Sequence, residues 1–215
     1  MNNEKISKVL EILSSNKGAK TMLGRFCEKY DPFMVLISTI LSARARDEVT
    51  EVIAEKLFEN YPDARSLMNA DKEEVIRIIR KIGFYNAKAR NIIETARILV
   101  EKHDEKVPDT LTDLVKLPGV GRKVANCVLV YSFKKDAIPV DTHVHRISNR
   151  LGWIKTMRPE DSERRLEKIV PRHLWNVINE VFVVHGKTVC LPISPRCSIC
   201  PIKNLCLRKK VKVSR

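Results

Sequence analysis

Glycine is scarce in this chain, at 7 of 215 residues, against a usual share of roughly 7%. Long apolar runs are absent too, because the longest, FMVLISTIL at 33–41, is far shorter than the roughly 20 residues that span a bilayer. No alternating strand pattern of useful length occurs. The first residues carry no apolar run behind a basic start, so we expect no secretory signal. These absences exclude a membrane protein and disfavour a β architecture.

Positive charge is abundant instead. Lys and Arg number 40 and Asp and Glu 26, which gives a net charge of +14 and a pI near 9.6. Such an excess predicts a polyanionic partner, most commonly nucleic acid. Without a secretory signal we expect a cytoplasmic, nucleoid-associated protein, in which six cysteines would rarely form lasting disulfides.

Helical periodicity dominates the chain and predicts an all-α fold. Ile6, Val9, Leu10 and Leu13 form an amphipathic stripe that needs a distant partner to bury it. Asp31 and Pro32 predict an N-cap and a first helical residue, and this helix, apolar on nearly every face, should lie centrally and run to about Ser42. Further helices are expected from Asp47, from Asp71 to Gly83, over about 89–103, over about 122–132, from Pro159, and from Pro171 to Gly186.

The segment LPGVGRKVA at 117–125 follows a short helical pattern at 111–116. Pro118 stops that pattern, and Gly119 and Gly121 permit the backbone angles of a tight turn. A turn that opens into a helix presents backbone N–H groups to an anion, and one interpretation of this anion is a DNA phosphate. The alternative is an ordinary connection between two helices with solvated lysines.

Lys123 falls in the first turn of the second helix, where the helix dipole and cationic neighbours lower the pKa of an amine. It is either a nucleophile or a phosphate contact. Asp141, eighteen residues later in PVDTHVHR, is predicted to be an N-cap, although its carboxylate could also help to deprotonate a lysine. His143 and His145 face different directions on a helix, so we expect surface or phosphate contacts rather than a chelate.

Four cysteines near the C-terminus follow the pattern C-x6-C-x2-C-x5-C, at Cys190, Cys197, Cys200 and Cys206. Their thiolates could hold zinc or an iron–sulfur cluster, and the spacing does not decide between them. Cys27 and Cys127 lie in helical patterns and should be apolar packing. The residues after Cys200 include six Lys or Arg and no acid, which indicates a solvated terminus or a second phosphate-binding stretch.

LPGVGRKVA, VDTH at 140–143 and HGKTVC leading into the cysteines together resemble the endonuclease III family, DNA glycosylases of the helix-hairpin-helix superfamily. The segments IGFYNAKARNII and LISTILSARARD extend the resemblance over nearly the whole chain. It implies two helical lobes flanking a DNA-binding cleft. A six-helix barrel with the hairpin would span 25–135, and a [4Fe–4S] cluster lobe would combine 1–24 with 136–215.

The resemblance also implies roles for individual residues. Lys123 would be the catalytic nucleophile and Asp141 its carboxylate partner. Phe84 stands where the family places an apolar wedge, although it could instead be a core aromatic beside Ile82. Arg44 stands where the family commonly has glutamine beside the orphaned base, and arginine donates hydrogen bonds but accepts none. Implied DNA contacts are Gly119, Val120, Gly121, Arg122, Arg44, Phe84 and His143, and implied cluster ligands are Cys190, Cys197, Cys200 and Cys206.

The function so implied is a monomeric DNA glycosylase with AP lyase activity. It would remove oxidised pyrimidines from duplex DNA that contains damaged or abasic nucleotides, through a lysine Schiff base and β-elimination. One alternative is a mismatch enzyme of the same fold that removes uracil or thymine opposite guanine. Another is a non-catalytic, metal-bearing DNA-binding module.

Overall fold

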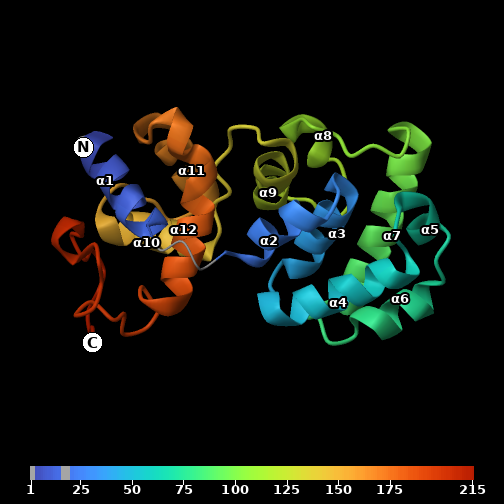
Figure 1. Cartoon of the computed structure of the whole chain (residues 1–215), viewed down its shortest axis with the longest axis horizontal. Helices are drawn as coiled ribbons and strands as arrows, with labels where there is room; N and C mark the ends of the chain where they lie inside the picture. Colours follow the sequence, from blue (N-terminus) through green and yellow to red (C-terminus); the bar gives the residue numbers. More distant parts are fainter. Residues whose placement is uncertain (1–2, 16–19) are drawn as a thin grey trace. The chain divides into compact units, whose positions relative to one another are not determined.

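The computed structural model describes residues 3–15 and 20–215, and these ranges contain helices and no strand. The all-α prediction is therefore confirmed. None of the helices in the described ranges combines the length and apolar character that crossing a membrane requires. Figure 1 shows the elements, which are α1 (Asn3–Ser14), α2 (Met22–Lys29), α3 (Pro32–Ser42), α4 (Asp47–Asn60), α5 (Ala64–Met68), α6 (Lys72–Ile79), α7 (Tyr85–Lys102), α8 (Leu111–Leu114), α9 (Arg122–Phe133), α10 (Thr142–Leu151), α11 (Pro159–Ile169), η1 (Arg172–Leu174), α12 (Trp175–Thr188) and η2 (Lys203–Leu205).

The chain divides into two compact units. The central unit comprises Met22–Lys134, and the terminal unit combines Met1–Thr21 with Lys135–Arg215. The central unit therefore contains α2 to α9, and the terminal unit contains α1 together with α10 to α12. Both ends of the sequence thus contribute to one hydrophobic core.

Helix α3 lies at the centre of the central unit, where it packs against α2, α4, α7 and α9. The Asp31 side chain caps it by accepting a hydrogen bond from the Met34 N–H at 2.9 Å, and Pro32 is its first residue. Residues 35–41 are all buried. The start, the end at Ser42 and the central position of this helix are confirmed.

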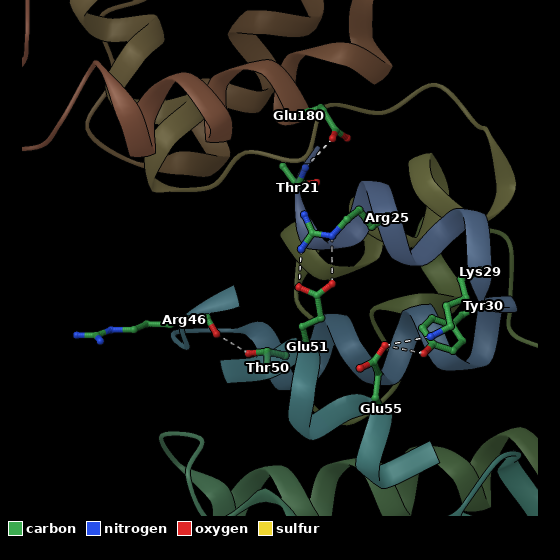
Figure 2. Close-up of polar contacts among 9 residues, drawn as sticks. All are labelled: Thr21, Arg25, Lys29, Tyr30, Arg46, Thr50, Glu51, Glu55 and Glu180. Atoms are coloured by element: carbon green, nitrogen blue, oxygen red, sulfur yellow. Dashed lines mark hydrogen bonds and ion pairs between the residues drawn. The ribbon is translucent and has the colours of Figure 1, made fainter. Parts of the chain in front are cut away.

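Ion pairs join α2 to α4 (Figure 2). The Arg25 guanidinium binds the Glu51 carboxylate, with Nε donating at 3.1 Å. One turn further along, Lys29 Nζ donates to Glu55 Oε1 at 3.0 Å, and the Tyr30 hydroxyl donates to the same oxygen at 3.2 Å. These contacts hold α2 against α4.

Helix α1 packs against α12 in the terminal unit. Ile6, Val9 and Leu10 are buried in a core that includes Ile178 and Phe182 of α12, so the predicted distant partner of this stripe is confirmed. Thr21 is the last residue of the N-terminal part of the terminal unit. Its N–H donates to Glu180 Oε1 of α12 at 2.8 Å (Figure 2).

Some expected helix ends differ from the structure. Gly186 lies inside α12 rather than at its end, because its missing side chain makes room for His143: a Cβ there would lie 2.3 Å from His143 Nδ1. Helix α6 ends at Ile79, well before Gly83. Helices α2 and α5, of 8 and 5 residues, were not predicted.

Candidate active site and cysteine centre

A tight turn joins α8 to α9 in the central unit. The Val120 N–H donates to Leu117 O at 3.1 Å within this turn. Gly119 has a φ of +78°, and a Cβ on it would lie 2.9 Å from Asn91 Nδ2 of α7. Thr95 Oγ1 of α7 donates to Pro118 O at 3.1 Å. The predicted glycine hairpin is therefore present, and α7 holds its backbone in place.

The hairpin opens into α9 without a side-chain cap. The N-cap residue is Gly121, and a Cβ on it would meet nothing within 4 Å, so the space in front of the helix is open. Arg122 is exposed and Lys123, in the first turn, is half-buried. The Val120 side chain is buried and its N–H is engaged in the turn. A helix N-terminus of this kind attracts anions.

Asp141 is the N-cap of α10 in the terminal unit, as predicted. Its Oδ1 accepts hydrogen bonds from the His143 N–H at 2.9 Å and the Val144 N–H at 2.8 Å. Both bonds use the same oxygen, which leaves Oδ2 outside the cap. Lys123 belongs to the central unit and Asp141 to the terminal unit.

His143 and His145 are both half-buried, which corrects the expectation of surface positions. His143 Nδ1 lies 3.1 Å from Arg146 Nη2, and this histidine packs where Gly186 leaves room. His145 Nδ1 lies 2.6 Å from the Ser162 hydroxyl. The two rings point to different neighbours, as their spacing predicted.

Arg44 and Phe84 lie together in the central unit, one after α3 and the other before α7. The Arg44 guanidinium carbon lies 5.8 Å from the centre of the Phe84 ring, within reach of a cation–π interaction. Both residues have a left-handed backbone, with φ of 55° and 61°, and both are exposed. Phe84 is 65% exposed, so the alternative of a core aromatic is wrong.

A further charged residue, Arg46, follows shortly after Arg44. It is the N-cap residue of α4, where its carbonyl accepts a hydrogen bond from Thr50 Oγ1 at 2.9 Å. Its exposed side chain extends away from the other labelled residues in Figure 2.

Sequence reasoning missed Lys88, which is only 6% exposed although it is a lysine. Its ammonium donates to Leu41 O at 2.8 Å and to Ala43 O at 2.7 Å, the carbonyls at the end of α3. Burial lowers the pKa of Lys88 to about 8. Its position one helical turn before the buried Ile92 was the available clue, since a lysine on the apolar stripe of a helix needs a buried partner.

The C-terminal cysteines surround one cavity in the terminal unit. Cys190, Cys197, Cys200 and Cys206 all line it, and all are free of disulfides. Cys127 is buried as predicted, whereas Cys27 is only half-buried and donates through Sγ to Gly24 O at 3.3 Å.

The surroundings of these sulfurs suit thiolate ligands. Arg150 Nη1 donates to Cys190 Sγ and the Arg208 N–H donates to Cys206 Sγ, each at 3.4 Å. Burial raises the pKa of the Cys200 and Cys206 thiols, so a bound cationic group is needed to keep them ionised. Within 3–15 and 20–215, no three His, Cys, Asp or Glu side chains converge closely enough to hold a single metal ion. Four cysteine thiols that line one cavity are the donor set that iron–sulfur clusters use.

Known proteins place the chain in a family. A model of the HhH-GPD superfamily of base excision DNA repair proteins matches residues 37–172. The endonuclease III of Thermotoga maritima is 51% identical over 191 residues, which cover 87% of this chain and 90% of that protein. This chain belongs to the endonuclease III family. The endonuclease III of Synechocystis is 40% identical, with 81% of this chain and 80% of that protein covered.

Solved structures of similar fold support this family assignment. A trapped covalent intermediate of endonuclease III with DNA, an estranged-adenine complex, has a TM-score of 0.88 and 35% identity over 98% of both chains. A thermostable thymine-DNA glycosylase has a TM-score of 0.85 at 24% identity, over 97% of this chain and 98% of that one, and so shares the fold. As a member of this family, the protein is a base-excision-repair DNA glycosylase and AP lyase that acts on DNA. The alternative of a non-catalytic module is thereby set aside.

Proposed function

We propose that this protein removes oxidised pyrimidines from damaged duplex DNA with Lys123 as its nucleophile. The observation that carries the proposal is the start of α9. There a half-buried lysine occupies the first turn of a helix that has no side-chain cap, directly behind a glycine turn. The helix N-terminus attracts a phosphate of the substrate, and this places the neighbouring sugar against the lysine.

The reaction begins with extrusion of the damaged nucleotide, which costs a few kcal/mol of lost stacking and pairing. The exposed Phe84 ring fills the space left in the duplex, and Arg44 faces the orphaned base. The unprotonated Lys123 amine attacks C1′ of the deoxyribose, and the bond to the base breaks. The base takes up a proton, the amine nitrogen loses its own, and the sugar ring opens to a Schiff base. Loss of a C2′ proton then expels the 3′ phosphate.

Asp141 and the hairpin support this step. The Oδ2 of Asp141, which the helix cap does not use, carries negative charge that favours loss of the amine proton and offsets positive charge on the sugar. Backbone groups of the hairpin at Gly119, Val120 and Gly121 hold the flanking phosphate. The Val120 N–H already serves the turn, so we assign most of this contact to the two glycines. Arg122 and His143 add donors to the DNA backbone.

The four cysteines of the terminal unit would hold a [4Fe–4S] cluster. Such a cluster supplies no step of base excision and, when bound, shapes the basic loop around its ligands. We accordingly assign the terminal unit as the cluster domain and the central unit as the six-helix barrel domain that carries the hairpin. The proposed enzyme works as a monomer on nucleoid DNA in the cytoplasm.

Borohydride trapping tests the nucleophile. We expect a covalent protein–DNA adduct with duplex that contains an oxidised pyrimidine or an abasic site, and its loss in Lys123→Ala. Lys116→Ala is the matched control, because Lys116 is an exposed hairpin lysine that pairs with Asp113 at 2.8 Å. An adduct that persists in Lys123→Ala would show that another amine reacts.

The purified protein itself tests the cluster. It should be yellow-brown and contain iron and acid-labile sulfide in equal amounts. A colourless protein that contains zinc would contradict the cluster.

A further inference from the structure

We propose that Lys88 is a positioning residue that holds Arg44 and Phe84 in their DNA-binding arrangement. The inference rests on the proposed function, in which this pair contacts the duplex around the extruded nucleotide. Lys88 itself is buried and touches no substrate, so its effect is transmitted through the backbone of two segments.

The first segment is the end of α3. A helix C-terminus leaves carbonyl groups without partners inside the helix, and a cation there is favourable. Lys88 Nζ donates to Leu41 O at 2.8 Å and to Ala43 O at 2.7 Å. Ala43 directly precedes Arg44, so this second bond fixes the peptide from which Arg44 leaves the helix.

The second segment is the start of α7. Phe84 is the N-cap residue of α7, and its carbonyl accepts a hydrogen bond from the Lys88 N–H at 3.0 Å. Lys88 therefore holds Phe84 through its own backbone and Ala43 through its side chain. The contact between the Arg44 guanidinium and the Phe84 ring closes a ring of interactions.

We call the hydrogen bonds of Lys88 with Leu41, Ala43 and Phe84 the Lys88 clamp. Backbone strain explains why this clamp is needed. Arg44 and Phe84 both have positive φ angles, which are strained in residues other than glycine. Strained residues persist only where neighbouring contacts determine their conformation. Removal of the Lys88 ammonium releases the α3 end, and we expect the Arg44 backbone to relax away from its position over the Phe84 ring.

The test compares two substrates of the holoenzyme. Extrusion of a base matters only in duplex DNA, whereas cleavage of single-stranded abasic DNA needs the Lys123 chemistry without a wedge. Lys88→Met keeps an apolar stem and removes the donors. We expect it to slow single-turnover base release from duplex by about tenfold or more and to leave single-stranded abasic cleavage within about twofold of wild type.

Two comparisons separate positioning from general destabilisation. Ile79→Val is the control, since Ile79 is fully buried in the same unit on α6 and this change removes one buried methyl group without removing a hydrogen-bond donor. It should affect neither substrate at a temperature where the protein is folded. In an Arg44→Ala background the effect of Lys88→Met on duplex should largely disappear, because residues that act through one another are not additive. Should Lys88→Met fail to fold, Lys88→Gln, which retains one amide donor group, carries the same comparisons.

Each remaining outcome overturns the inference. Unchanged base release from duplex would show that the clamp has no function. Equal loss on both substrates would indicate general destabilisation, and additivity with Arg44→Ala would show that Lys88 does not act through Arg44. Failure of the proposed chemistry is distinguishable, since Lys123→Ala would then still cleave single-stranded abasic DNA.

Discussion

Asp141 makes both of its cap hydrogen bonds with a single oxygen, which lets its structural and chemical roles be separated. Asparagine caps helices as well as aspartate does, so Asp141→Asn should leave the free energy of unfolding within about 0.5 kcal/mol of wild type. Loss of the charge should slow base release by about a hundredfold. Single-turnover kinetics and urea unfolding, measured on the same preparation, test both expectations.

The N-cap of α3 offers the control for this prediction. Asp31 caps its helix in the same way, and Asp31→Asn should change neither stability nor base release. A parallel loss of stability and activity in Asp141→Asn would show that the cap alone explains the importance of the residue.

Gly119 and Gly121 lie two residues apart, but only the position of Gly119 requires a glycine. Gly119 has a φ of +78° and a side chain close by, whereas Gly121 has a φ of −90° and open space around it. Gly119→Ala should therefore lower the free energy of unfolding by at least about 1 kcal/mol. Gly121→Ala should lower it by less, because this position has neither a positive φ nor a close neighbour and loses only the preference of an N-cap for glycine over alanine. Equal losses in urea unfolding would contradict the strained turn at Gly119.

At the scale of elements, a glycine inside α12 allows close contact with α10. A Cβ on Gly186 would lie 2.3 Å from His143 Nδ1 and 2.9 Å from Arg146 Nη2. Gly186→Ala should thus destabilise the protein by about 1–3 kcal/mol, although alanine normally favours a helix over glycine. His143→Ala in the same chain should recover part of the loss. Thermal unfolding that shows Gly186→Ala to be stabilising would contradict this packing.

The sequence predicts elements best where local chemistry decides them. Asp31 and Pro32 determine the start of α3 by a cap and a fixed φ, and Pro159 does the same at the start of α11. Gly186 was misplaced because a tertiary contact, not a helix end, requires the glycine. Helix α5 was missed because its five residues complete little more than one helical period.

In the candidate site, too, the features that depend on local sequence were predicted, and those that depend on tertiary contacts were not. The glycine hairpin and the Asp141 cap are local and were predicted, and the four cysteines are grouped in the sequence itself. The Arg44–Phe84 stack and the Lys88 clamp join residues about 40 positions apart, and no local pattern encodes the meeting of α3 and α7. Their only trace in the sequence is a lysine on an apolar helix stripe.

At the scale of the whole molecule, the net charge of +14 includes a basic C-terminal tail whose charged side chains are exposed and whose backbone is hydrogen-bonded to the rest of the terminal unit. The Arg215 N–H donates to Pro195 O and the Ser198 N–H donates to Arg215 O, each at 2.9 Å. The Lys209 N–H donates to Arg150 O at 3.0 Å. The tail therefore holds the cysteine loop, and removing it would disturb the cavity that the four cysteines line as well as the charge.

Substitution of the tail's side chains keeps its backbone contacts with the cysteine loop. It therefore tests how the tail's charge affects the salt dependence of DNA binding. Each phosphate contact contributes about 0.9 to the slope of log affinity against log salt. If the tail touches DNA, changing Lys209, Lys210 and Lys212 together to glutamine should lower the steepness of this slope by about 0.9 for each lysine that contacts a phosphate. Fluorescence anisotropy at several salt concentrations measures the slope. The control triple, Lys8, Lys56 and Lys102 to glutamine, removes the same charge from exposed helix positions. Because long-range attraction depends on total charge whereas counterion release depends on direct contacts, equal slopes in the two triples would remove the tail from the DNA-binding surface.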